Sequence, residues 1–168
     1  MKALHLLRHA KSSWNEPYRS DRERGLNKRG RRDAPRMGMA LANSVEPLAV
    51  CVSPARRAQL TLEGVCLGWP ELGKLSHQTV DALYTFDASD LVDFICQYEQ
   101  DQAALCLIGH NPALTDLINH LDHAASLDNL PTAAYARLSL AIDEWRRLAP
   151  GCGTLEQLLL PRRLPEYD

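Results

Sequence analysis

Apolar residues along this chain fall into short, nearly continuous runs separated by longer segments of mixed polarity. Strands are predicted over residues 2–7, 48–52 and 103–109, because uninterrupted apolar runs of this length are typical of parallel strands covered on both faces. Residues 135–142 alternate more openly between apolar and polar positions and predict a later, less buried strand. Residues 78–80 predict a very short one.

Two dipeptides that end in proline indicate helix starts between these strands. Ser53-Pro54 predicts a helix start, because serine caps free backbone N–H groups and proline suits the first helical position. Asn111-Pro112 repeats the signal. The leucine and isoleucine residues that follow it at i, i+3, i+4 and i+7 predict a helix with one buried face.

Two further segments have helical periodicity. Residues 88–99 predict a helix with Asp87 or Ser89 as its cap. Residues 28–43 predict another, and Pro35 inside that segment predicts a kink or a late start. Strands that alternate with helices predict a three-layer α/β/α sandwich around a mainly parallel sheet. The tail after residue 160 is expected to run irregularly over the surface.

Length and composition narrow the class of protein. A chain of 168 residues suits a single domain, residues 1–168, with a substantial core. The apolar content of 45% and the charged content of 24% are ordinary for a globular protein, and a formal net charge of −2 argues against nucleic acid as a partner. No apolar run approaches the roughly 20 residues that span a bilayer, so no membrane partner is expected.

The number and spacing of the five cysteines indicate in which cellular compartment the protein is expected. Their number is odd, and none of them form a C-x-x-C pair. This pattern predicts reduced, mostly buried thiols rather than a disulfide framework. The N-terminal apolar run is interrupted early by His5 and Arg8 and is too short for a signal peptide. A cytoplasmic location is therefore expected.

Polar residues follow the predicted parallel strands at one edge of the sheet, where α/β proteins bind ligands. Arg8 and His9 follow the first strand, residues 53–57 follow the second, and His110 and Asn111 follow the third. Guanidinium groups match phosphate oxygens, and a neutral imidazole can attack phosphorus. Nearby cations lower the pKa of an imidazole and so keep it neutral. The sequence therefore predicts a phosphate pocket with His9 as nucleophile.

The partners of His9 follow from the same chemistry. His110 can stabilise the equatorial oxygens as charge shifts in the transition state. Arg57 lies in the first turn of a predicted helix, with Thr61 one turn further along the same face. An acid that protonates the leaving group is also needed, and Asp81 in "VDALYT" is the candidate.

These segments resemble a known family. "LLRHAKSSWN" at residues 6–15 resembles the first signature of the histidine phosphatase superfamily, with alanine in place of its usual glycine. "SPARRAQLT" at 53–61 resembles its second motif, and "IGHNP" at 108–112 resembles the motif of its second histidine. The chain is most similar to SixA-type phosphohistidine phosphatases, which residues 21–34 and 130–134 also resemble.

The resemblance implies roles for particular residues. His9 would attack the phosphoryl group and become a transient phosphohistidine, which water then hydrolyses, with no metal and no cofactor. The spacing of the second motif identifies Arg57 rather than Arg56 as its arginine. Asp81 matches only loosely the place of a general acid in larger relatives. The phosphate-binding residues implied are Arg8, Ser12, Asn15, Arg57, His110 and Asn111.

The resemblance also implies a class of substrate. A short chain without enclosing insertions favours hydrolysis over mutase activity, on a phosphorylated protein such as a phosphohistidine-bearing signalling protein. An alternative function within the same superfamily is that of a broad-specificity phosphomonoesterase, which acts on small phosphorylated molecules. The sequence makes no prediction of the oligomeric state.

Two hypotheses from other classes remain open. Residues 19–32 hold seven Lys or Arg against two acids and could form a nucleic-acid-binding arm in a non-enzymatic binder. Part of this segment could instead contact an acidic partner, with Arg24 near the pocket. A metal hydrolase is the other hypothesis. Its candidate ligands would be His110, His120, Asp122 and His123.

Overall fold

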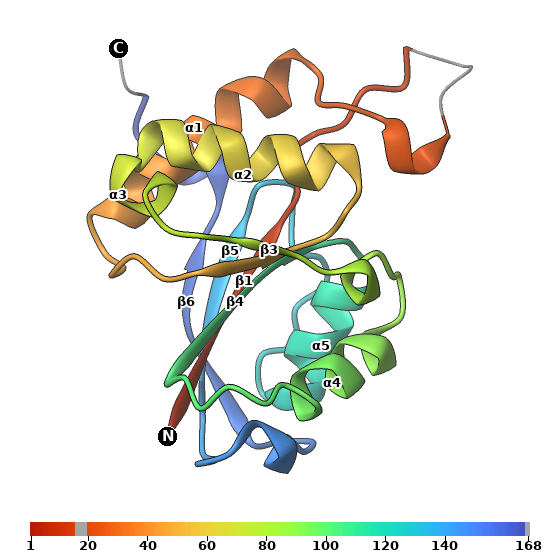
Figure 1. Ribbon diagram of the computed structural model, residues 1–168, viewed down its shortest axis with the longest axis vertical. Helices are drawn as coiled ribbons and strands as arrows, with labels where there is room; N and C mark the ends of the chain where they lie inside the picture. Colours follow the sequence, from red (N-terminus) through yellow and green to blue (C-terminus); the bar gives the residue numbers. More distant parts are fainter. Residues whose placement is uncertain (16–19, 167–168) are drawn as a thin grey trace.

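The computed structural model describes residues 1–15 and 20–166 of the chain, and its centre is one six-stranded sheet (Figure 1). The strand order across the sheet is β3-β2-β4-β1-β5-β6. The strands are β1 (Lys2–Arg8), β2 (Val50–Val52), β3 (Gln78–Thr79), β4 (Ala104–Gly109), β5 (Tyr135–Leu140) and β6 (Gly153–Leu159).

The sheet is parallel on one side and antiparallel on the other. The pairs β3–β2, β2–β4 and β4–β1 are parallel, whereas β1–β5 and β5–β6 are antiparallel. The predicted α/β sandwich with a mainly parallel sheet is therefore confirmed. The parallel half brings the carboxyl ends of β1, β2 and β4 to one edge.

Helices cover both faces of the sheet (Figure 1). Three helices lie on one face and two on the other, which gives the three layers. The first group is α1 (Lys28–Ala42), α2 (Arg56–Gly68) and α3 (Pro70–Gly73), and the second is α4 (Ala88–Cys96) and α5 (Ala113–Leu121). Short 3₁₀ helices are η1 (Asp21–Glu23), η2 (Asp81–Leu83), η3 (Trp145–Arg147) and η4 (Pro161–Arg163).

The apolar runs of the strands supply both cores, because successive side chains point to opposite faces. In β1, Leu4 and Leu6 pack in the cluster that includes the apolar faces of α4 and α5. Leu7 packs in the other cluster, with residues of α1, α2 and α3. Strands β1, β2 and β4 each contribute residues to both clusters, and this packing fixes the residues that follow them.

Most predicted elements agree with the structure, and the differences have local causes. Helix α1 begins at Lys28 with Asn27 as its cap, so the late start at Pro35 was wrong. Asp87, not Ser89, caps α4. Strand β6 was missed because its exposed and half-buried residues alternate weakly along the edge of the sheet.

The start of α1 packs tightly against the segment that follows β1. A Cβ atom at Gly30 would lie 2.2 Å from the Lys11 carbonyl oxygen, so only glycine permits this approach. Asn27 N–H donates to the same oxygen at 3.0 Å. These contacts hold the loop after β1, which carries His9, against α1.

The structure also bears on cysteines and membranes. All five cysteines are free. In residues 1–15 and 20–166, no helix combines the length and apolar character needed to cross a bilayer.

Candidate active site

His9 and His110 meet at the carboxyl edge of the sheet. Strands β1 and β4 are neighbours and parallel, with Arg8 paired to Gly109, so the next residue of each strand emerges at the same level. The two imidazole ring centroids lie 5.2 Å apart. Both rings are buried, His9 at 7% exposure and His110 at 1%.

A single contact sets the tautomer of His9. Its Nδ1 lies 2.7 Å from the Ala10 carbonyl oxygen, which can only accept, so Nδ1 carries the proton. The Nε2 atom of the neutral ring then holds the free electron pair. Burial lowers the pKa of His9 to about 3; the bond to Ala10 opposes this shift, and His110, Arg57 and Arg8 add to it. The ring is therefore neutral at physiological pH, and burial contributes more to this than the neighbouring cations do.

His110 is held by a residue that the sequence analysis assigned differently. Its Nε2 lies 2.7 Å from the Ser53 hydroxyl, which also accepts from Ala55 N–H at 3.2 Å. Ser53 was predicted to cap the next helix, but α2 begins only at Arg56, and the hydroxyl instead orients His110. Burial first and Arg57 second lower the pKa of His110 to about 4.

Two arginines flank the histidines. Arg57, in the first turn of α2, is 2% exposed, and Arg8 donates from Nη1 to the Leu130 carbonyl oxygen at 2.9 Å. Thr61 joins the two elements, because its hydroxyl donates to the Arg57 carbonyl and accepts from Ala10 N–H at 2.9 Å. The loop that carries His9 and the helix that carries Arg57 are thus directly bonded.

These side chains line one cavity of about 290 Å³, which is large enough for a phosphoryl group and part of its leaving group. Its rim includes two exposed aromatic rings, Trp14 and Phe86. The lining residues are Arg8, His9, Lys11, Ser12, Trp14, Asp21, Arg24, Arg57, Phe86, His110, Asn111 and Thr132. Six of the predicted site residues, and Arg24, are therefore brought together.

Three nitrogen atoms of this cluster have no hydrogen-bond partner within the described part of the chain. They are Nε of Arg8, Nε of Arg57 and Nδ1 of His110, and all three are buried. Buried polar atoms are almost always paired in native proteins. Unpaired N–H donors on two guanidinium groups, with an unpaired imidazole nitrogen in the same cluster, are what an oxyanion site requires before its ligand binds.

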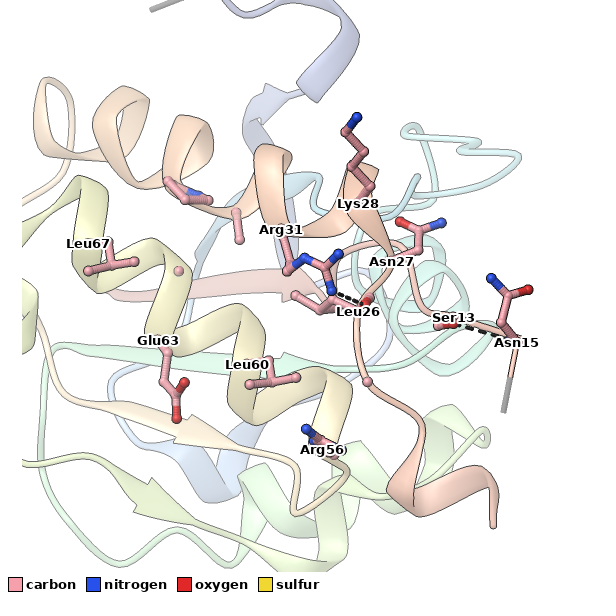
Figure 2. Close-up of a pocket in the computed structure, with 14 residues that line it drawn as sticks. Ser13, Asn15, Leu26, Asn27, Lys28, Arg31, Arg56, Leu60, Glu63 and Leu67 are labelled. Atoms are coloured by element: carbon pink, nitrogen blue, oxygen red, sulfur yellow. Dashed lines mark hydrogen bonds between the residues drawn. The ribbon is translucent and has the colours of Figure 1, made fainter. Parts of the chain in front are cut away.

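Two predicted site residues lie elsewhere. The Asp81 carboxylate is 90% exposed and faces Arg22 at 3.9 Å, because η2 turns it outwards. Asn15 is exposed and lines a separate groove of about 540 Å³ between α1 and α2, shown in Figure 2. Arg56 lines the same groove, which supports the choice of Arg57 over Arg56 for the phosphate site.

The cavity also holds a carboxylate, Asp21, that was not predicted from the sequence. Asp21, in η1, accepts from Arg57 Nη2 at 3.0 Å and from the Tyr84 hydroxyl at 2.5 Å. Arg24 donates to its other oxygen from Nη2 at 3.1 Å, and its Nη1 donates to the Ser12 hydroxyl at 2.8 Å. Partial burial opposes ionisation, but the bonds from Tyr84 and Arg57 outweigh it and lower the pKa of Asp21 to about 2.

The two competing hypotheses gain no support from these contacts. Within residues 1–15 and 20–166, no group of three His, Cys, Asp or Glu is arranged to hold a metal ion. Asp122 instead accepts from the backbone N–H groups of Ala124 and Leu155. Of the basic segment, residue 19 lies outside the described residues, Arg24 enters the cavity, and Lys28 and Arg31 line the groove.

Buried neutral histidines predict how stability depends on pH. His5, like His9 and His110, is buried, and burial lowers its pKa to about 4. Below pH 6.5 the unfolded chain binds protons that these three folded histidines do not, so acid favours unfolding. We expect the free energy of unfolding to fall between pH 6.5 and about 4.5, by up to about 1.4 kcal/mol per pH unit for each histidine.

Urea denaturation at pH 7, 6 and 5 measures this effect. A free energy of unfolding that stays constant over this range would contradict burial of neutral imidazoles. Substituting His110 by Asn should reduce the slope by about a third, because one of the three groups is removed.

Comparisons with known proteins agree with this geometry. The model of the histidine phosphatase superfamily, branch 1, matches residues 4–93. The uncharacterised chloroplastic protein At3g52155 of Arabidopsis thaliana is 27% identical, over 94% of this chain and 77% of its own.

Solved structures are similar over almost their whole length. One is the protein histidine phosphatase SixA complexed with tungstate, with a TM-score of 0.75, 25% identity and coverage of 95% of this chain and 97% of that one. Another is a mycobacterial glucosyl-3-phosphoglycerate phosphatase, which shares the fold with a TM-score of 0.68 at 17% identity, over 94% and 98% of the two chains. Two histidines and two arginines around one cavity, on this fold and with this family match, lead to one conclusion: the chain belongs to the histidine phosphatase superfamily, branch 1, and is a phosphatase.

Proposed function

We propose that this phosphatase hydrolyses phosphohistidine on a protein through a covalent phosphohistidine intermediate on His9. In the first step the Nε2 electron pair of His9 attacks phosphorus, and the bond between phosphorus and the leaving group breaks. The leaving imidazole takes a proton from solvent. In the second step water attacks the phosphorus, and inorganic phosphate leaves as the P–N bond to His9 breaks.

The cavity supports both steps electrostatically. The phosphoryl oxygens would be bound by Arg8, Arg57 and His110, whose unpaired nitrogens lie in this cluster. The bond from His9 Nδ1 to the Ala10 carbonyl keeps the ring oriented throughout. It also stabilises the positive charge that the ring acquires when Nε2 is phosphorylated.

The state of Asp21 is the observation that favours a phosphoramidate substrate over an alkyl phosphate. An alkoxide leaving group needs a proton from an acid, whereas a protonated imidazole leaves readily. Asp21 is the carboxyl group at the cavity, and its bonds from Tyr84 and Arg57 keep it ionised, so it accepts protons poorly and has none to donate.

The rim of the cavity fits a planar leaving group. Trp14 and Phe86 are 73% and 50% exposed and line the same cavity as His9. An imidazole ring of the substrate could stack on either of them. The similarity to a SixA protein histidine phosphatase structure supports the same class of substrate.

A comparison of three substrates tests this proposal. The kcat/KM values would be measured for a phosphohistidine protein, phosphoramidate and p-nitrophenyl phosphate, each with EDTA and with vanadate. We expect both P–N substrates to exceed p-nitrophenyl phosphate by at least about tenfold, because their protonated leaving groups depart neutral, whereas p-nitrophenolate departs as an anion beside the ionised Asp21. Vanadate should inhibit, and EDTA should have no effect.

The His9→Ala variant serves as the control for spontaneous hydrolysis of the P–N bond. Faster turnover of p-nitrophenyl phosphate than of both P–N substrates would favour the broad phosphomonoesterase instead. A preference for phosphoramidate over the phosphohistidine protein would argue against a protein substrate.

A further inference from the structure

The guanidinium group that should bind phosphate already binds an anion of the protein itself. Arg57 is 2% exposed, and both of its terminal nitrogens donate to Asp21. Nη2 donates to the carboxylate at 3.0 Å, and Nη1 donates to the backbone carbonyl of the same residue at 2.6 Å. The side-chain bond can be exchanged for another anion while the backbone bond stays in place.

The carboxylate of Asp21 is bound as an anionic ligand would be. The Tyr84 hydroxyl donates to the oxygen that Arg57 binds, and Arg24 donates to the other oxygen from Nε and Nη2 at 3.2 and 3.1 Å. Two guanidinium groups and a phenol thus surround one carboxylate that is 43% exposed and lines the cavity with His9. A phosphoryl group in this cavity would compete with the carboxylate for Arg57.

A phosphate and this carboxylate repel one another if both stay in place. Both negative charges would lie within one cavity of about 290 Å³ and beside the same guanidinium group. Solvent screens charges at such short separations incompletely, so the phosphoryl group and the carboxylate would repel one another strongly. The pKa of Asp21 is about 2, so protonation does not relieve the repulsion at physiological pH. A bound phosphoryl group must therefore displace the carboxylate from Arg57 or bind more weakly beside it.

We propose that Asp21 is a specificity-determining residue whose carboxylate occupies Arg57 in the free enzyme and is displaced by the phosphoryl group. This inference rests on the proposed function, since it takes Arg57 as a phosphate ligand. Monoanions of low charge density compete poorly with a carboxylate that is held by three side chains, whereas a phosphoryl dianion replaces it. The returning carboxylate also promotes release of inorganic phosphate, the product.

The Asp21→Asn variant tests this competition. Asparagine is nearly isosteric and can still accept a hydrogen bond from Arg57, but it carries no charge. We expect inorganic phosphate to bind the variant about tenfold more tightly than the wild-type enzyme, because a charged competitor is replaced by a neutral one. Isothermal titration calorimetry measures the Kd of phosphate, and inhibition kinetics measure the Ki of vanadate.

Two further variants separate competition from general effects of charge. Asp128→Asn removes one negative charge from the exposed loop beside Asn129, whose amide oxygen accepts from Asn111 of the cavity. This matched control should change the Kd of phosphate less than about twofold, because solvent screens its charge. Tyr84→Phe removes one bond to the carboxylate but keeps the charge, so it should tighten phosphate binding by a smaller factor than Asp21→Asn.

Each other result has a definite meaning. Unchanged or weaker phosphate binding by a folded Asp21→Asn enzyme would overturn the inference and would make Asp21 a support for Arg57. The Tyr84→Phe variant decides the same question if Asp21→Asn does not fold, since weaker binding there would again overturn it. A wild-type enzyme that neither hydrolyses P–N substrates nor binds vanadate would overturn the proposed function itself.

Discussion

Replacing His9 by alanine should reduce hydrolysis of phosphoramidate by at least about 10⁴-fold, because it removes the proposed nucleophile that forms the covalent intermediate. The fold should survive, since the hydrogen bond of the ring to the carbonyl of the next residue, Ala10, ties no distant part of the chain. Circular dichroism and thermal unfolding check the fold, and steady-state kinetics check the activity.

A trapping experiment makes this prediction specific. Rapid acid-free quenching with a ³²P-labelled substrate should label the wild-type chain and leave the His9→Ala variant unlabelled. His123→Ala is the matched control, because it removes an exposed imidazole away from the cavity. Full activity of the His9→Ala enzyme would exclude the covalent mechanism.

The second large effect is expected at neighbouring arginines. Arg57→Ala should lower kcat/KM by about 100- to 1,000-fold, because it removes a buried cation from the developing charge of the transition state. Arg56→Ala should lower it less than about threefold, because its exposed guanidinium lies in the outer groove of Figure 2, where solvent screens it.

Arg56→Ala is the matched control for Arg57→Ala, because both variants remove one positive charge from the first turn of α2. Arg57→Lys should fall between the wild-type enzyme and Arg57→Ala, because an ammonium group keeps the charge but loses the planar two-pronged donor. Equal losses from Arg56→Ala and Arg57→Ala would show that the second arginine of the site was assigned wrongly.

The sequence was most informative where a functional residue directly follows a buried parallel strand. His9 and His110 could be placed together because the apolar runs before them predict neighbouring strands with a common edge. Arg57 could be identified because its spacing within a recognisable segment excluded Arg56. The apolar runs thus carried both histidines to the correct edge of the sheet, and the spacing of a motif chose between the two arginines.

Residues in short irregular segments escaped prediction. Asp21 and Tyr84 belong to or follow three-residue 3₁₀ helices, which are too short to have a detectable periodicity. The turn of η2 decides that Asp81 points into solvent and that Tyr84 three residues later reaches Asp21. Contacts of this kind depend on how loops pack in three dimensions, and local sequence does not encode them separately.

The placement of the aromatic residues has an optical consequence. Of the three tryptophans, Trp69 and Trp145 are 3% exposed in the interior, whereas Trp14 stands at the cavity rim with the Arg24 guanidinium carbon 3.6 Å from its ring. Arg24 also donates a hydrogen bond to Asp21, so a movement of that carboxylate would change the surroundings of the Trp14 indole. This indole is exposed to solvent and therefore accessible to collisional quenchers. We therefore expect the intrinsic fluorescence of the unlabelled chain to change when the pocket is occupied.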